Sequence, residues 1–317
     1  MKYWVWLSQI PGLGPIRKKK LLEKYKTPEK IYMLKKEELL KNKGIGEELA
    51  NNILDRKYRE NLDKHLEYMR KNNIEIISIY NKYYPEKLKQ IYDSPISLYV
   101  KGNYKILNNL SIAIVGCREA TEYGKKAAKY FSYSLTKEGI NIVSGLARGI
   151  DSFSHIGAIC GKLEENTKNV DNLSTDKKRL NIGNTIAVVG TGLDRIYPDE
   201  NRYLEEQIIK TGGAVISEYP LGTKPEKMNF PARNRIISGI SSGILVVEAK
   251  EKSGTLITVD FALEQGRDVF VVPGNINSIN SVGTNNLIKQ GAKLVTNYKE
   301  IILNFLWFFD AKILIKY

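Results

Sequence analysis

Seven short apolar runs, separated by stretches with helical spacing, constrain the fold of this chain more than any other feature. They begin at residue 111, recur about every 20 to 50 residues, and read SIAIVG, INIVSG, TIAVVG, AVISEY, GILVVEA, DVFVVPG and KLVTN. Strands that are buried on both faces form such continuous Val/Ile/Ala runs, and parallel strands need helical crossovers between them. The pattern therefore predicts an α/β domain with a doubly wound, mostly parallel sheet.

The first third of the chain has a different texture. Apolar residues at helical spacing predict a small helical domain over residues 1–72. Two Gly-x-Gly turns, PGLGP at 11–15 and KGIGEE at 43–48, each open a helix, as in a helix-hairpin-helix whose backbone N–H groups can face a phosphate. Glycine-containing turns in an ordinary helical bundle are an equally good interpretation.

The remaining boundaries follow from composition. Residues 73–105 are expected to form a connector with short strands, residues 106–303 the α/β core, and residues 304–317 a short hydrophobic tail. The stretch 161–184 is rich in Asn, Lys and Thr and has neither helical nor strand periodicity. We interpret it as a polar surface insertion without a chemical role.

The charge of the chain is strongly positive and unevenly spread. The net charge is +14, and the first 105 of the 317 residues hold 23 Lys+Arg against 13 Asp+Glu. Such a balance favours a polyanionic partner such as nucleic acid, although a lysine-biased composition alone also produces it. Two cysteines and two histidines are too few for a disulfide framework or a zinc cluster. Without a long apolar run or a signal peptide at its start, the chain is expected to be cytoplasmic.

Each of the first six predicted strands is followed by a polar loop that contains glycine. The loops are GCREATEYGKK (116–126), SGLARGID (144–151), GTGLDRIYPDEN (190–201), EYPLGTKPEKMNFPARNR (218–235), EAKEKSGTLIT (248–258) and PGNINSINSVGTNN (273–286). Ligands of open parallel sheets bind beyond the carboxyl ends of the strands, where these loops should meet.

Several side chains in these loops are suited to holding a phosphate beside a base. Arginine and lysine supply charge, a helix start supplies backbone N–H groups, and an aromatic ring supplies a stacking surface. The residues predicted to hold a phosphate beside a base, whatever the nucleotide ligand, are Gly116, Arg118, Arg148, Lys227, Phe230, Arg233, Asn234, Arg235, Ser253, Gly254 and Thr255.

The same loops give little support to catalysis. Neither the G-x-G-x-x-G dinucleotide fingerprint nor a G-x-x-x-x-G-K-[ST] phosphate loop is present. Cys117 has no histidine near it in sequence, and Asp151 and Glu248 fit a helix cap and a strand-end charge better than an acid/base pair. His155 fits a packed histidine. We therefore expect no catalytic residues, no cofactor and no metal.

The six loop motifs, taken in order over about residues 111–297, closely resemble the bacterial DNA-processing protein A family, DprA, also called Smf. The helical start is similar to the sterile-alpha-motif-like domain that precedes the core in this family. The resemblance implies an extended Rossmann-like core that dimerises and holds single-stranded DNA in a positively charged pocket. In the family's motifs, the arginine of the first loop matches Arg118. The basic and aromatic residues before the family's RNR motif, which stands here at residues 233–235, match Lys227 and Phe230.

The resemblance also implies a function that is not enzymatic. Family members protect incoming single-stranded DNA during natural transformation and help to load the recombinase RecA onto it. Two features depart from the family: Cys117 replaces the usual Ser or Ala, and the end NFLWFFDAKILIKY leaves no room for the C-terminal winged helix of many members. The alternatives are a nucleotide-processing hydrolase that uses Glu248 and the Ser253–Thr255 helix start, and a protein-binding adaptor with a vestigial pocket.

Overall fold

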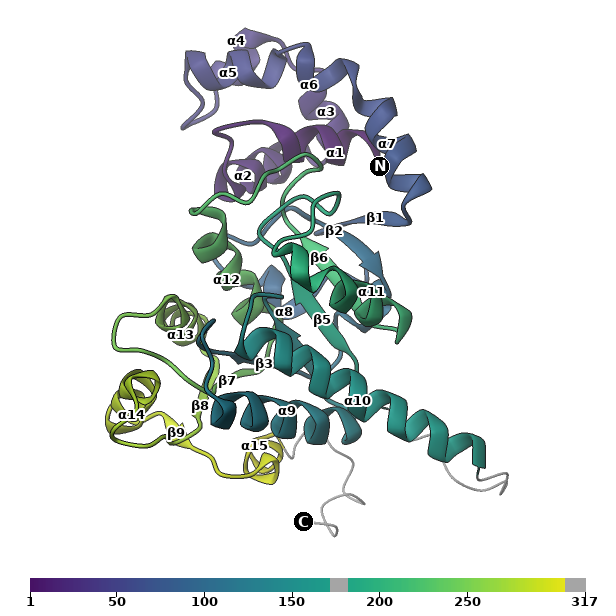
Figure 1. Cartoon of the computed structure of the whole chain (residues 1–317). Helices are drawn as coiled ribbons and strands as arrows, with labels where there is room; N and C mark the ends of the chain where they lie inside the picture. The colour runs from purple at the N-terminus through teal and green to yellow at the C-terminus, as the bar shows by residue number, and fades with distance from the viewer. Residues whose placement is uncertain (172–181, 306–317) are drawn as a thin grey trace.

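The computed structural model describes residues 1–171 and 182–305 and is built around one twisted sheet (Figure 1). Within these described residues the sheet has nine strands, in the order β1-β2-β6-β5-β4-β3-β7-β8-β9. The strands are β1 (Ile74–Ser78), β2 (Ser97–Gly102), β3 (Ser111–Val115), β4 (Asn141–Ser144), β5 (Thr185–Val188), β6 (Ala214–Ser217), β7 (Gly243–Val246), β8 (Asp268–Val271) and β9 (Lys293–Leu294). Every pair of neighbouring strands among β3 to β9 is parallel. This confirms the predicted doubly wound, mostly parallel, Rossmann-like sheet.

The chain reverses its winding direction at β3. Ala113 pairs with Val143 of β4 on one side and with Ile244 of β7 on the other. The loops that follow β3, β4 and β7 therefore meet at one place, beyond the carboxyl ends of the strands. Such a topological switch point is where open α/β sheets bind ligands.

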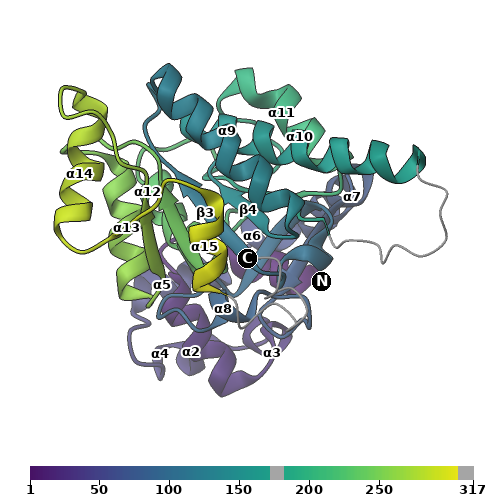
Figure 2. The same ribbon diagram turned by 90° about the horizontal axis from the view of Figure 1, so that it is seen from below.

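Helices cover both faces of the sheet (Figure 2). The structure places them at α8 (Glu86–Lys89), α9 (Glu122–Lys137), α10 (Ile150–Asp171), α11 (Arg202–Lys210), α12 (Asn229–Ile240), α13 (Gly254–Glu264), α14 (Val282–Lys289) and α15 (Tyr298–Asn304), with 3-10 turns at Tyr104–Ile106, Asp199–Asn201 and Ile279–Ser281. Alternate residues of β3 enter different cores, because side chains alternate across a strand. Ile112 packs with Phe131 of α9, whereas Val115 packs with Ile236 of α12.

The N-terminal helices form a separate layer at the β1–β2 edge of the sheet (Figure 1). They are α1 (Lys2–Gln9), α2 (Pro15–Tyr25), α3 (Pro28–Tyr32), α4 (Lys36–Leu40), α5 (Glu47–Leu54), α6 (Lys57–Glu60) and α7 (Leu62–Lys71). Their apolar side chains share one buried cluster with residues of the sheet region, so that Leu22 of α2 belongs to the same core as Leu193 and Val215. The helical prediction for residues 1–72 agrees with these elements.

Two sequence interpretations need correction. The strands expected in the connector are edge strands of the main sheet, with β1 antiparallel to β2 and β2 antiparallel to β6. Helix α10 continues through Asp171, so the stretch from residue 161 does not begin an irregular insertion. A helix that has already formed can propagate through polar residues without an apolar stripe. The rest of that stretch at 172–181, and the tail after residue 305, lie outside the described residues.

Candidate nucleic-acid interface

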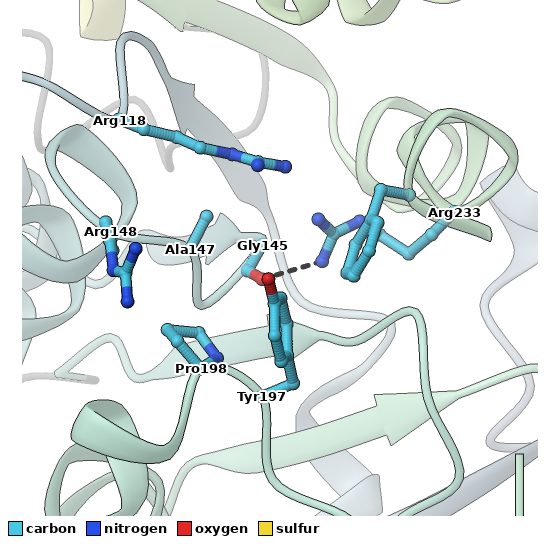
Figure 3. A pocket seen from close by; sticks show the side chains of 8 residues that line it. Arg118, Gly145, Ala147, Arg148, Tyr197, Pro198 and Arg233 are labelled. Carbon is cyan, nitrogen blue, oxygen red and sulfur yellow. Dashed lines mark hydrogen bonds between the residues drawn. The ribbon is translucent and has the colours of Figure 1, made fainter. Parts of the chain in front are cut away.

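A groove of about 810 Å³ opens at the switch point of the sheet. Its walls come from the loops after β3 and β4, the start of α12 and the start of α13. Nine of the predicted DNA-binding residues line it, namely Gly116, Arg118, Lys227, Phe230, Arg233, Asn234, Ser253, Gly254 and Thr255. Arg148 lines a narrower end of the same region together with Arg118, Phe230 and Arg233 (Figure 3).

Arg118 extends across this narrow end from the loop after β3 (Figure 3). Its guanidinium carbon lies 5.7 Å from the centroid of the Phe230 ring, within cation–π range. No described residue forms a hydrogen bond or ion pair with the Arg118 side chain. Its donors are therefore available to a phosphate.

A second aromatic ring, which the sequence reasoning did not single out, stands beside Phe230. The Tyr197 ring lies 5.4 Å from Phe230, centroid to centroid, with the planes inclined by 37°. Tyr197 is 43% exposed, so its ring presents a surface to the groove. The sequence feature that could have identified Tyr197 is its position as an aromatic residue in the loop after the third predicted strand. Bases of any sequence can stack on such rings.

Arg233 forms the floor of the groove rather than a free cation. Its guanidinium is almost fully buried and donates hydrogen bonds to the carbonyl oxygens of Val188 and Gly145, the latter at 2.7 Å. Burial lowers its pKa to about 10, although the neighbouring carboxylate of Asp151 opposes that shift. Arg233 therefore fastens α12 to the ends of β4 and β5, which sets the position of Phe230.

The structure does not bring Arg235 into the groove with Arg233. Residues two positions apart on a helix face in nearly opposite directions, so Arg235 points away from the groove that Arg233 reaches. Its guanidinium is buried and forms ion pairs with Glu218 at 2.5 Å and Asp93 at 3.0 Å. The RNR motif therefore divides its arginines between two sides of α12.

Arg148 is exposed and already has a partner. Its Nε and Nη2 atoms donate to the two carboxylate oxygens of Glu200 at 2.6 and 2.7 Å. A phosphate that approached this end of the groove would have to compete with that carboxylate. Arg118 and Lys227, for which no described residue supplies an ion-pair partner, are better placed to bind it.

The start of α13 closes the other wall of the groove. Ser253 caps the helix, and its Oγ accepts a hydrogen bond from the Thr255 N–H at 3.2 Å. Lys252 lies just before this cap, is exposed and lines the groove, but the sequence reasoning did not select it. Lys250 also lines the groove, and its ammonium pairs with Glu119 at 2.8 Å. On this wall, the backbone N–H groups at the start of α13 lie beside positively charged lysines, an arrangement that suits a phosphate.

The acidic residues that were weighed as an acid/base pair have structural partners. The Asp151 carboxylate accepts hydrogen bonds from the N–H groups of Gly145 and Ala147 at 3.1 and 3.3 Å, which holds the loop after β4. The Glu248 carboxylate accepts hydrogen bonds from the backbone N–H of Thr121, at 3.0 Å, and from its hydroxyl, where α9 begins. Both groups shape the loops of the groove.

The two other reactive side chains are also buried. Burial raises the pKa of the Cys117 thiol, which disfavours the thiolate that a nucleophile requires. His155 is buried, its Nδ1 lies 2.6 Å from the Thr185 hydroxyl, and burial lowers its pKa to about 3. At neutral pH the imidazole is therefore an uncharged packing residue.

A doubly wound α/β protein with a cationic and aromatic groove at its switch point belongs to the class of Rossmann-like ligand-binding proteins. The model of the family described as DNA recombination-mediator protein A matches residues 75–306, and this chain belongs to that family. A model described as SAM-like Helix-hairpin-helix tandem matches residues 7–56, which confirms the predicted helix-hairpin-helix start. The resemblance drawn from the loop motifs is thus confirmed.

Individual relatives agree with this assignment. Protein Smf of Synechocystis sp. is 36% identical over 304 residues, which cover 95% of this chain and 71% of the relative. The X-ray structure of DNA processing protein A (DprA) from Streptococcus pneumoniae superposes with a TM-score of 0.78 at 34% identity, covering 96% of this chain and 97% of that one. DNA processing protein A from Helicobacter pylori, described for its unique single-stranded DNA binding mode, gives 0.61 at 28% identity and covers 75% and 97%.

No helix within residues 1–171 and 182–305 has both the length and the apolar content that crossing a membrane requires.

Proposed function

We propose that this protein binds single-stranded DNA without sequence preference in the groove at the switch point. The observation that carries the proposal is the guanidinium of Arg118, which has no ion-pair or hydrogen-bond partner among the described residues and lies over the Phe230 ring. The groove around it is also lined by Tyr197, Lys227 and Lys252. Cations bind the backbone of a single strand, and aromatic faces stack on its bases whatever their sequence. The described binding mode of the Helicobacter pylori relative supports the same substrate.

The wider role that we propose is that of a recombination mediator. The protein protects incoming single-stranded DNA in natural transformation and loads RecA onto it, acting as a homodimer and not as an enzyme. Family membership supports this role. The hydrogen bonds that Asp151 and Glu248 make to loop backbones favour binding over nucleotide hydrolysis.

Fluorescence anisotropy with labelled oligo-dT tests the binding proposal. The wild type should prefer the single strand to a duplex, and both Arg118→Ala and Lys227→Ala should weaken binding several-fold and lower the dependence of log affinity on log salt by about 0.7 each. Lys129→Ala is the matched control, because Lys129 is an exposed cation of α9 away from the groove. Equal affinity of the wild type and both groove variants would contradict the proposal.

The RecA role needs a separate assay. RecA filament assembly on single-stranded DNA that is covered by a single-strand-binding protein should start sooner when the wild type is added. Arg118→Ala should lose this effect in proportion to its loss of DNA affinity. If the wild type binds DNA but leaves the rate of RecA assembly unchanged, the binding proposal survives and the loading role fails.

A further inference from the structure

The N-terminal helices carry a concentration of positive charge that the groove does not use. Residues 17–43 contain eleven Lys or Arg side chains against four Asp or Glu. Among the residues that the structure describes, only Lys36 of these eleven forms an ion pair, with Glu47 at 2.5 Å. The described residues of the chain do not neutralise this surface, so its charge is available to a partner.

Five of these cations gather on one side of the layer. Arg17, Lys20 and Lys24 are spaced three and four residues apart on α2, which puts them on one face of the helix. The turn after α4 lies beside that face, because Lys24 donates a hydrogen bond to Asn42 at 2.8 Å and the Arg17 side chain lies against Gly44. Lys41 and Lys43 flank Asn42 in this turn, and all five cations are exposed. We call these five residues the cationic cluster.

We propose that the cationic cluster binds the phosphate backbone of the same DNA strand, beyond the part that the groove holds. This inference rests on the proposed function and extends the DNA-binding surface onto the N-terminal layer. Five exposed, closely spaced cations that have no anionic partner in residues 1–171 and 182–305 match a polyanion with regularly spaced charges. Binding would release counterions from the strand, so the contribution of the cluster should depend steeply on salt.

The N-terminal layer is held firmly against the part of the chain that forms the groove. Leu21 and Leu22 of α2 share a buried cluster with Val189 and Leu193, at the end of β5. Lys18 lies on the buried side of α2, where the carboxylate of Glu218 acts on it, and Glu218 begins the loop that leads to Lys227. The two cationic surfaces therefore belong to elements that share one core, and a strand long enough to reach both would make its second contact intramolecularly.

The rigidity of the nucleic acid favours a single strand as the occupant. Duplex DNA has a persistence length of about 150 bp and bends little over the size of one protein. A single strand is flexible and can follow a path from a recessed groove to an exposed helix face. We therefore assign the cluster to single-stranded DNA.

The test compares the affinity of the full chain for two labelled oligo-dT strands. One has about 6 nucleotides, within the size of a single site, and the other has about 30 nucleotides, several times that size. The variant Lys20→Gln/Lys41→Gln/Lys43→Gln should bind the short strand as the wild type does. It should bind the long strand about tenfold more weakly, with a salt slope lower by about 2.

A control variant with the same loss of charge separates this surface from net charge. Lys64→Gln/Arg70→Gln/Lys71→Gln alters three exposed cations of α7, which lies apart from α2 in both views (Figures 1 and 2). It should leave the affinities for both strands near those of the wild type. An equal loss in both triple variants would overturn the inference, because net charge would then explain it.

Other outcomes distinguish this inference from the proposed function. If the wild type and the cluster variant bind the long strand equally, the cluster does not touch DNA, while tight binding of the short strand keeps the groove assignment intact. If the cluster variant weakens only duplex binding, the occupant is a duplex and the inference as stated is wrong. If the wild type binds neither strand, both assignments fail together.

Discussion

At the scale of single residues, the site depends on which side chains are free and which are engaged. Arg118 and Arg233 both reach the groove, but Arg233 is bound to carbonyl oxygens at its floor. The sequence predicted both as DNA-binding residues, because a motif gives residue types and not their hydrogen-bond partners. The sequence did not predict Tyr197 as a site residue, because only the folded loop brings its ring beside Phe230.

Arg235 gives a prediction about stability. Arg235→Ala should lower the free energy of unfolding by about 3 kcal/mol, because it leaves Glu218 and Asp93 without the buried guanidinium that pairs with them. Arg148→Ala removes an Arg–Glu pair that is exposed, and should leave the free energy of unfolding nearly unchanged. Urea unfolding of both variants checks this. Equal stability of Arg235→Ala and the wild type would show that the buried ion pairs do not hold α12 in place.

At the scale of elements, the sequence predicted the parallel strands well and the edges of the fold less well. Apolar runs such as the one in β3 are buried on both faces, so their pattern alone identifies them. Strand β1 lies at the edge of the sheet, and its short sequence IEIIS carries an exposed Glu75 between buried isoleucines, which left its membership of the sheet open. The second half of α10 has no apolar stripe, so periodicity could not predict it.

A glycine in the loop after β4 gives a prediction at this scale. Gly149 has φ +70°, and a Cβ there would lie 2.3 Å from the carbonyl oxygens of Cys117 and Arg118. Gly149→Ala should therefore destabilise the protein by about 1–3 kcal/mol and weaken DNA binding, because the loop that carries Arg118 must move. Gly254→Ala is the matched control for stability alone, since a Cβ at Gly254 meets no atom within 4 Å but Gly254 lines the groove. Thermal unfolding of both variants and the oligo-dT affinity of Gly149→Ala are measured, and equal stability of the two variants would contradict the strained position of Gly149 in the loop.

At the scale of the whole molecule, a partly buried lysine of the N-terminal layer lies where the charge of Glu218, after β6, acts on it. Lys18 donates a hydrogen bond to the carbonyl oxygen of Ser8 at 2.9 Å, and burial lowers its pKa to about 8, although Glu218 opposes that shift. Sequence reasoning predicted the helical layer and its positive charge, but not which lysine is buried. That depends on how the layer packs on the sheet, which involves residues more than a hundred positions apart.

The lowered pKa of Lys18 predicts a dependence of stability on pH. Between about pH 8 and 10.5 the unfolded chain binds more protons at Lys18 than the folded chain, so this group adds stability as the pH rises and loses it as the pH falls through about 8. The unfolding free energy of the wild type relative to Lys18→Met should therefore rise by at most about 1.4 kcal/mol per pH unit in this window. Urea unfolding of both proteins from pH 7 to 10 measures it. A difference that stays constant with pH would show that Lys18 titrates normally.

The most direct test of the central claim is to map where a single strand contacts the protein. An oligonucleotide with photoreactive 5-bromodeoxyuridine should crosslink to Tyr197 and Phe230 when it is irradiated on the wild type, and mass spectrometry of the digested complex identifies the attached residues. We expect crosslinks in the groove that unlabelled oligo-dT suppresses and that Arg118→Ala weakens. Crosslinks confined to exposed tyrosines elsewhere, such as Tyr92 and Tyr203, would contradict it.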